Sequence, residues 1–81
     1  METLVQLKAG SRAKITGING SGAYRNRVCT FGFMPGTRLV VVDNRGYGPV
    51  LVRLRDTLVA LGRREAAAVN VKTVNPEASH G

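Results

Sequence analysis

The chain has 81 residues and a mass of 8.7 kDa, which leaves room for a single small domain and excludes a two-domain enzyme. A folded chain of this length buries roughly 60–65 % of its unfolded surface, so the core is thin and a deep catalytic pocket is not expected. The twelve Lys and Arg against five Asp and Glu give a formal charge of +7. This charge favours an anionic partner such as nucleic acid, a membrane surface or an acidic protein.

The cysteine count and the N-terminal segment bear on where the protein works. The chain has one cysteine, Cys29, so it cannot form an intramolecular disulfide, and this indicates a reducing compartment. Glu2 stands where a signal peptide would be basic, and no apolar h-region follows it. The longest apolar runs, 39–42 and 66–69, are far shorter than the ~20 residues of a membrane span. We therefore expect a cytoplasmic protein without a direct membrane span.

The first third of the chain predicts two short helices on either side of a strand. Thr3 and Gln6 fit a capping box, which predicts a short helix over residues 4–9. Apolar residues alternate over 12–18, as in a half-buried strand. Residues 23–31 carry apolar side chains at helical spacing and predict a second short amphipathic helix.

The middle of the chain predicts a turn followed by a β-hairpin. Residues 33–36 fit a type II turn, because Pro35 fixes φ at the first central position and Gly36 accepts a positive φ at the second. Residues 37–43 and 50–55 are rich in β-branched side chains, so we expect two strands joined by the Gly-containing loop between them.

The last third predicts two further strands and one helical turn. A turn at residues 56–57 leads into a short strand over 58–61, and the Ala-rich segment 63–67 predicts a short helix. Residues 69–74 alternate again and complete the sheet. Residues 75–81 are expected to form a flexible C-terminal tail.

This pattern predicts a mainly β fold, a small SH3-like antiparallel barrel of about five strands that spans residues 1–74. The connections are too short for the crossovers that parallel strands need. Closing the sheet into a barrel would also hide the edges that a flat sheet of this size exposes.

A set of motifs spread over residues 4 to 74 carries a family resemblance. The motifs are Leu4-x-x-Leu7-x-x-Gly10, Ala13-x-Ile15-x-Gly17-Ile18, Arg27-x-x-x-x-Gly32-Phe33-Met34-Pro35-Gly36, Gly48-Pro49-Val50-x-Val52, Ala60-Leu61-Gly62-Arg63-x-x-Ala66 and Val69-x-Val71. The sequence resembles the FeoA family, ferrous iron transport protein A, and the segment from Arg27 to Gly36 is its most distinctive part.

The resemblance implies an SH3-like barrel that acts beside FeoB, a membrane Fe(II) transporter with a cytoplasmic G-protein domain. It implies an accessory or regulatory protein that docks onto the cytoplasmic part of FeoB, within a family linked to transition metal ion binding. A similar barrel occurs as the C-terminal domain of DtxR-type regulators, so the alternative is a nucleic-acid-binding or transcription-related barrel. The scattered basic residues and the presence of only two Tyr and two Phe disfavour a nucleic-acid partner.

Catalytic and metal chemistry find little support in the sequence. One Cys, one His and five separated acids do not form a recognisable set of metal ligands, and His80 falls in the predicted tail. Cys29 fits a small buried residue better than a reactive thiol. The glycine-rich turns lack the Lys-Ser/Thr ending of a P-loop. We therefore expect no enzyme activity, catalytic residue, metal site or cofactor.

The remaining candidates are side chains for binding a protein partner. They are Tyr24, Arg27, Phe33, Met34, Arg45 and Tyr47. Of Phe33 and Met34, one is expected to close the end of the barrel while the other is exposed, and the sequence does not say which. Tyr47 either projects from its loop as an interface anchor or folds back over the hairpin. An exposed strand edge would also permit weak homo-oligomers.

Overall fold

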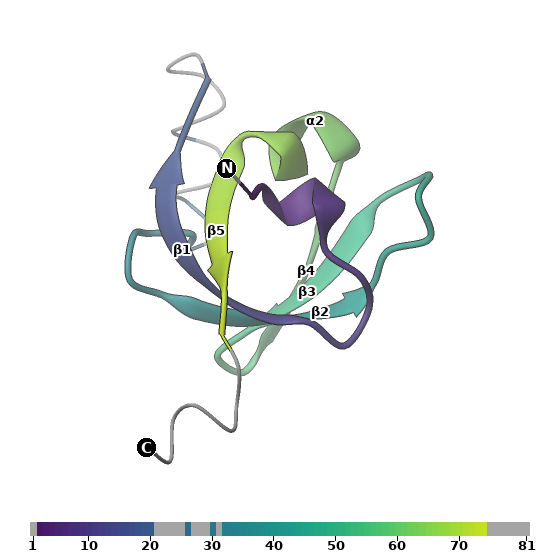
Figure 1. The fold of residues 1–81 in the computed structure, drawn as a ribbon, viewed down its shortest axis with the longest axis horizontal. Coiled ribbons are helices and arrows are strands. Elements are labelled where there is room, and N and C mark those ends of the chain that lie inside the picture. The colour runs from purple at the N-terminus through teal and green to yellow at the C-terminus, as the bar shows by residue number, and fades with distance from the viewer. Residues whose placement is uncertain (1, 21–25, 27–29, 31, 75–81) are drawn as a thin grey trace.

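A computed structural model describes residues 2–20, 26, 30 and 32–74. Within these residues, five antiparallel strands form one sheet in the order β4-β3-β2-β1-β5. The strands are β1 (Arg12–Ile18), β2 (Arg38–Asp43), β3 (Val50–Leu54), β4 (Thr57–Leu61) and β5 (Val69–Thr73). A 3₁₀ turn, η1 (Leu4–Gln6), and a short helix, α2 (Arg63–Ala67), complete the described fold (Figure 1). This is the predicted mainly β, SH3-like architecture.

The inner face of the curled sheet carries the core. In β3, Val50, Val52 and Leu54 are buried, whereas Leu51 and Arg53 point to the outer face. Each fully buried aliphatic side chain stabilises the fold by roughly 1.5–3 kcal/mol relative to exposure. The sheet therefore has a core face and a solvent face, and charged side chains are confined to the second.

The two end strands of the sheet, β4 and β5, are covered differently. In the described part of the chain they are not hydrogen-bonded to each other. Instead α2 connects them along the sequence and packs on both strands and on η1. The N-terminal segment lies along β5, where the Val71 N–H donates to the Glu2 carbonyl over 3.0 Å. In the described residues, closure thus depends on a helix and the N-terminal segment.

The first predicted helix is shorter than expected. The Thr3 N–H donates to Gln6 Oε1 over 2.9 Å, as the capping box predicts, but η1 ends at Gln6 because Leu7 is already extended at φ −82° and ψ 144°. The predicted helix over 23–31 lies outside the described residues except for Asn26 and Thr30, which are helical. Cys29 and the predicted tail over 75–81 also lie outside them.

Two backbone details of the sheet were not predicted. A register shift between Ile15 and Gly17 in β1 buries Ile18 together with Ile15, although a strict alternation would place Ile18 on the outer face. The β3–β4 hairpin turns one residue earlier than expected, because Leu54 pairs with Thr57. Its first loop residue, Arg55, has φ 59°, a conformation that Gly or Asn adopts more readily.

The turn before β2 is confirmed. The Thr37 N–H donates to the Met34 carbonyl over 3.0 Å, which closes a four-residue turn, and Gly36 has φ 92° as a type II turn requires. The Gly36 N–H also donates to the Ile15 carbonyl over 2.7 Å. This bond attaches the turn to β1.

Candidate partner-docking surface

The loop over residues 44–49 connects β2 to β3 and extends away from the sheet (Figure 1). Tyr47 in this loop is 69 % exposed, so its ring projects and does not fold back over the hairpin. Arg45 beside it is exposed, with its Nε 3.3 Å from Asp43 Oδ2. An ion pair this open to solvent contributes little stability, so Arg45 can exchange it for a partner's carboxylate at small cost. Tyr and Arg are the residue types that most often dominate binding energy at interfaces.

The base of this loop is held by the side chain of Asn44. Its Nδ2 donates to the carbonyl oxygens of Val5 over 2.9 Å and Leu7 over 2.7 Å. Its Oδ1 accepts from the Gly46 N–H over 3.2 Å, the local bond of an Asx turn. Asn44 therefore joins the loop to the segment around η1, which lies 37 to 39 residues earlier in the chain.

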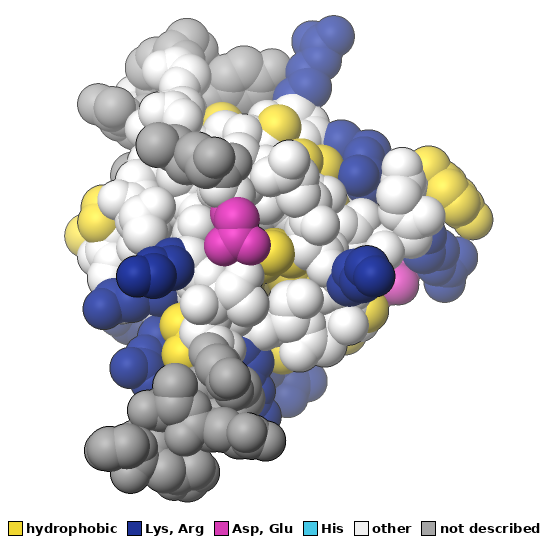
Figure 2. Space-filling view, viewed as in Figure 1, with side chains coloured by type: hydrophobic (Ala, Val, Ile, Leu, Met, Phe, Trp, Pro, Cys, Tyr) yellow, Lys and Arg dark blue, Asp and Glu magenta, His cyan; other side chains and the backbone are white. Residues whose placement is uncertain are grey.

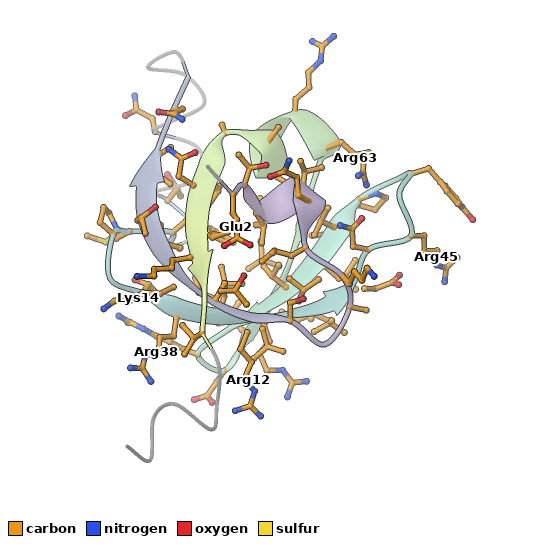
Figure 3. The ribbon with its side chains drawn as sticks, in the orientation of Figure 1. Glu2, Arg12, Lys14, Arg38, Arg45 and Arg63 are labelled. Atoms are coloured by element: carbon orange, nitrogen blue, oxygen red, sulfur yellow. The ribbon has the colours of Figure 1, made fainter. Side chains whose placement is uncertain are left out.

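Arg63 at the start of α2 completes the network. Its Nη1 donates to Asn44 Oδ1 over 3.0 Å and to the Gly48 carbonyl over 3.3 Å, and its Nη2 reaches the Val5 carbonyl at 3.5 Å. Figure 3 shows Arg63 between α2 and the loop that carries Arg45. The loop is thus tied at its base while its tip is exposed. A surface fixed in this way loses less conformational entropy on binding than a free loop does.

Sequence reasoning missed this network. Residue 44 falls in a loop and residue 63 in a predicted helix, and nothing in the pattern indicates that they meet. The available signal was the Asn directly after a strand with Gly two residues later, which favours an Asx turn. That signal predicts the local bond to Gly46 but not the bonds to η1 and α2.

The structure does not gather the six predicted binding residues on one surface. Tyr24 and Arg27 lie outside the described residues. Met34 is 56 % exposed, but it belongs to the turn before β2, whereas Arg45 and Tyr47 follow β2. A strand of six residues separates the two ends by roughly 20 Å. Arg45 and Tyr47 therefore form one candidate surface, and Met34 belongs to a different one.

Phe33, one of the six predicted binding residues, has no exposed side chain to offer a partner. Its side chain is 0 % exposed and is among the largest that the core encloses completely. The preceding Gly32 has φ 92°, and a Cβ there would lie 3.3 Å from Leu54 Cδ2. The chain passes close to β3 at this point and directs the ring inward, so Phe33 closes the core and Met34 is the exposed member of the pair.

Across 2–20, 26, 30 and 32–74, no group of three or more His, Cys, Asp or Glu lies close enough to hold a metal ion. Nor does any helix within those ranges have the length and hydrophobicity to cross a membrane.

The sequence matches a known protein family. Residues 2–73 match the FeoA domain. The chain belongs to the FeoA family. A relative in Porphyromonas gingivalis, a fusion of Fe(2+) transport protein A with the Fe(2+) transporter FeoB, is 32 % identical over 77 residues, which cover 94 % of this chain and 9 % of the relative. The chain thus spans less than a tenth of that protein, and its family is associated with ferrous iron transport.

Solved structures support the same assignment. A crystal structure of an iron uptake regulatory protein, FeoA, superposes with a TM-score of 0.86 at 22 % identity and covers 90 % of this chain and 97 % of its own. The zinc complex of Stenotrophomonas maltophilia FeoA, described as a prokaryotic SH3 domain protein, has a TM-score of 0.78 at 27 % identity, with 89 % and 91 % of the two chains covered.

The barrel of transcriptional regulators is also similar. A manganese-dependent transcriptional repressor has a TM-score of 0.83 at 21 % identity, and the match covers 90 % of this chain and 41 % of the repressor. An identity this low shows a shared fold and nothing about function. The family match and the superposition on FeoA structures together confirm the prediction of the FeoA family and its SH3-like fold.

Proposed function

We propose that this FeoA protein is a cytoplasmic, non-catalytic accessory protein of ferrous iron uptake, which docks onto the cytoplasmic part of a FeoB-type transporter through the loop over residues 44–49. The observation that carries the proposal is an exposed Tyr47 and Arg45 on a loop whose base is fixed by Asn44 and Arg63.

The fused relative supports the choice of partner. In that protein a segment similar to this chain and a FeoB transporter occur in one polypeptide. A covalent linker raises the effective concentration of one part for the other to the millimolar range, which helps when the two parts work in contact. A separate chain must reach the same geometry by affinity alone, and for this it needs an interface anchor.

Tyr47 fits the role of that anchor. An aromatic side chain supplies a large contact area through few rotatable bonds, and the fixed loop base reduces the entropy lost on docking. Arg45 adds a guanidinium beside the ring that can pair with a carboxylate of the partner through two hydrogen bonds.

A binding measurement with matched variants tests the proposal. Calorimetric titration of the purified cytoplasmic region of FeoB with this chain is expected to show binding, and Tyr47→Ala is expected to weaken it by about 30-fold, the effect of losing one hot-spot side chain. Leu58→Ala is the control. Leu58 is 54 % exposed but lies on β4, near the opposite end of β3 from the loop.

The control variant is expected to bind within about threefold of the unmodified chain, as a residue outside the contact should. If Leu58→Ala weakens binding as much as Tyr47→Ala does, the loop is not the docking surface. If the unmodified chain does not bind the cytoplasmic region, the proposed partner is wrong.

A further inference from the structure

The outer face of the sheet carries a cluster of positive charge that the linear sequence does not reveal. Six basic side chains from four strands and one hairpin are exposed there, and we call them the cationic face. They are Arg12, Lys14, Arg38, Arg53, Arg55 and Lys72. In Figure 2 Lys and Arg side chains gather along the lower left of the molecule, and Figure 3 places Arg12, Lys14 and Arg38 there, away from Arg45 and Arg63.

Strand register brings these charges together. Lys14 in β1 is paired with Lys72 in β5 on one side and with Arg38 in β2 on the other. Like charges directly opposite one another in a sheet are destabilising. Arg12 and Arg53 both pair with Val40 from opposite sides. The positive charges at these positions therefore repel one another in the folded protein, and a bound anion would reduce this repulsion.

The described acids do not neutralise the cationic face. Asp43 lies beside Arg45, and Glu65 Oε1 accepts from the Gly62 N–H over 3.0 Å. Glu2 accepts from the Thr73 hydroxyl over 2.8 Å. Asp56 sits in the β3–β4 hairpin next to Arg55 and is the described acid nearest to the face in the sequence. One carboxylate cannot balance six cations.

Apolar surface lies among the charges. A hollow of about 250 Å³ has four arginines around it, with apolar side chains between them. Its lining is Arg12, Arg38, Arg53, Arg55, Ala13, Leu39, Val40 and Val74. Next to it, Leu58 pairs with Arg53 and is 54 % exposed. Long basic side chains that surround exposed aliphatic groups can keep their charges at a polar boundary while their stems and neighbours contact apolar material.

We propose that the cationic face docks on a bilayer surface that contains anionic phospholipids. The six charges come from four strands and one hairpin, and Lys14 and Lys72 do not line the hollow, so the face extends beyond it. This spread suits many dispersed phosphate headgroups better than a single small anion. The exposed Leu58 and the half-buried Val40 suit the lipid boundary. Among the described residues that form the face or line its hollow, none is aromatic, so they offer no ring on which nucleic-acid bases could stack. This inference does not depend on the docking of Tyr47, which lies on a different loop.

Vesicle co-sedimentation of the purified chain tests the inference. The probe is vesicles of phosphatidylcholine with about 30 % phosphatidylserine, compared with pure phosphatidylcholine, because a basic residue near an anionic leaflet changes the partition coefficient by about fivefold. We expect binding to the mixed vesicles that weakens as salt is raised. The double variant Arg38→Gln/Arg53→Gln is expected to reduce the partition coefficient by about 25-fold.

A matched double variant separates the face from the total charge. Lys8→Gln/Arg64→Gln also removes two positive charges, but at exposed positions that do not line the hollow. On a logarithmic scale, its reduction of the partition coefficient is expected to be less than half of that caused by Arg38→Gln/Arg53→Gln. Equal losses from the two double variants would overturn the cationic face as the site. Equal binding to pure phosphatidylcholine would overturn the role of anionic lipid.

A measurement of nucleic-acid binding completes the experiment. Fluorescence anisotropy with a labelled duplex and a labelled single strand is carried out at the same salt concentrations. Binding to either that is tighter than to the mixed vesicles, and that is lost in Arg38→Gln/Arg53→Gln, would reassign the face to nucleic acid and overturn the membrane proposal. Amide NMR spectra of each variant show whether the fold is retained.

Discussion

Asn44 joins three separate segments of the chain through one side chain. Its amide reaches the carbonyls of Val5 and Leu7, the N–H of Gly46 and the guanidinium of Arg63. Both carbonyls belong to the segment around η1, and Arg63 begins α2. A partly buried amide with its donors and acceptor all in use is costly to remove, because the partners left behind lose hydrogen bonds that water does not fully replace.

Asn44→Ala is therefore expected to lower the free energy of unfolding by about 2–3 kcal/mol, since several hydrogen bonds are lost at a partly buried site. Urea denaturation followed by circular dichroism measures the change. Asn19→Ala, at an exposed position directly after β1, serves as the control and is expected to stay within about 0.5 kcal/mol of the unmodified chain. A loss of similar size in both variants would show that Asn44 has no special structural role.

Glu2 gives the fold a pH dependence. The Thr73 hydroxyl, and then the Thr73 backbone N–H, donate to its carboxylate and hold the pKa of Glu2 below its ordinary value of 4.5. A carboxyl whose folded-state pKa is depressed stabilises the fold above its unfolded-state pKa, and this contribution is lost as pH falls through the folded-state pKa.

The melting temperature of Glu2→Gln measured against pH tests this linkage. The variant is expected to melt below the unmodified chain at neutral pH, and the gap should narrow as pH falls below 4.5, because the carboxyl of the unfolded chain is protonated first and that of the folded chain only at lower pH. Thr73→Val removes the hydroxyl donor but keeps the backbone donor, so its pH dependence should be intermediate. A gap that stays constant from neutral to acid pH would contradict the linkage.

At the scale of elements, α2 bridges the two end strands of the sheet, β4 and β5, which are not hydrogen-bonded to each other in the described part of the chain. It packs on both of these strands and on η1. Ala66 is 0 % exposed on this helix, whereas Ala67 beside it is exposed. The helix can approach the sheet closely because its inward residue is small.

Ala66→Leu is expected to lower the free energy of unfolding by about 1–3 kcal/mol, the usual cost of forcing extra methylene groups into a packed site. Ala67→Leu adds the same atoms on the solvent side and should change it by less than about 0.5 kcal/mol. Thermal and urea denaturation of the pair measures the difference. Equal stability of the two variants would mean that α2 is not closely packed against the sheet.

The strands were predictable from the sequence because their segments are rich in β-branched side chains or alternate apolar with polar residues. β3 is the clearest case, with Val50, Val52 and Leu54 inward. Local signals failed where tertiary structure overrides them. The helical turn at the N-terminus ends before Leu7, earlier than predicted. The β3–β4 turn places Arg55 at a positive φ, which an Arg in the sequence does not indicate. Both departures depend on the register and packing of neighbouring segments.

Sites depend on contacts that no local pattern contains. Which of Phe33 and Met34 is buried depends on the path of the chain beside Leu54. The hydrogen bond between Asn44 and Arg63 joins residues that are 19 apart in the sequence. The basic residues appear scattered along the sequence, yet β1 pairs Lys14 with Lys72. Tyr47 was a candidate by residue type alone, and its exposure became known only from the structure.

At the scale of the whole molecule, the two surfaces proposed above differ in character. The loop with Arg45 and Tyr47 lies beyond one end of β2, and the cationic face spreads over the outer side of the sheet. A protein that contacts a transporter and the bilayer around it needs two such surfaces at once.

Amide NMR of the labelled chain, titrated with the cytoplasmic region of FeoB, tests the docking account most directly. The account predicts progressive shifts at Arg45, Gly46, Tyr47 and Gly48, while the turn from Met34 to Thr37 at the other end of β2 stays unchanged. Spectra that do not change at all, or changes confined to the Met34 turn, would contradict it.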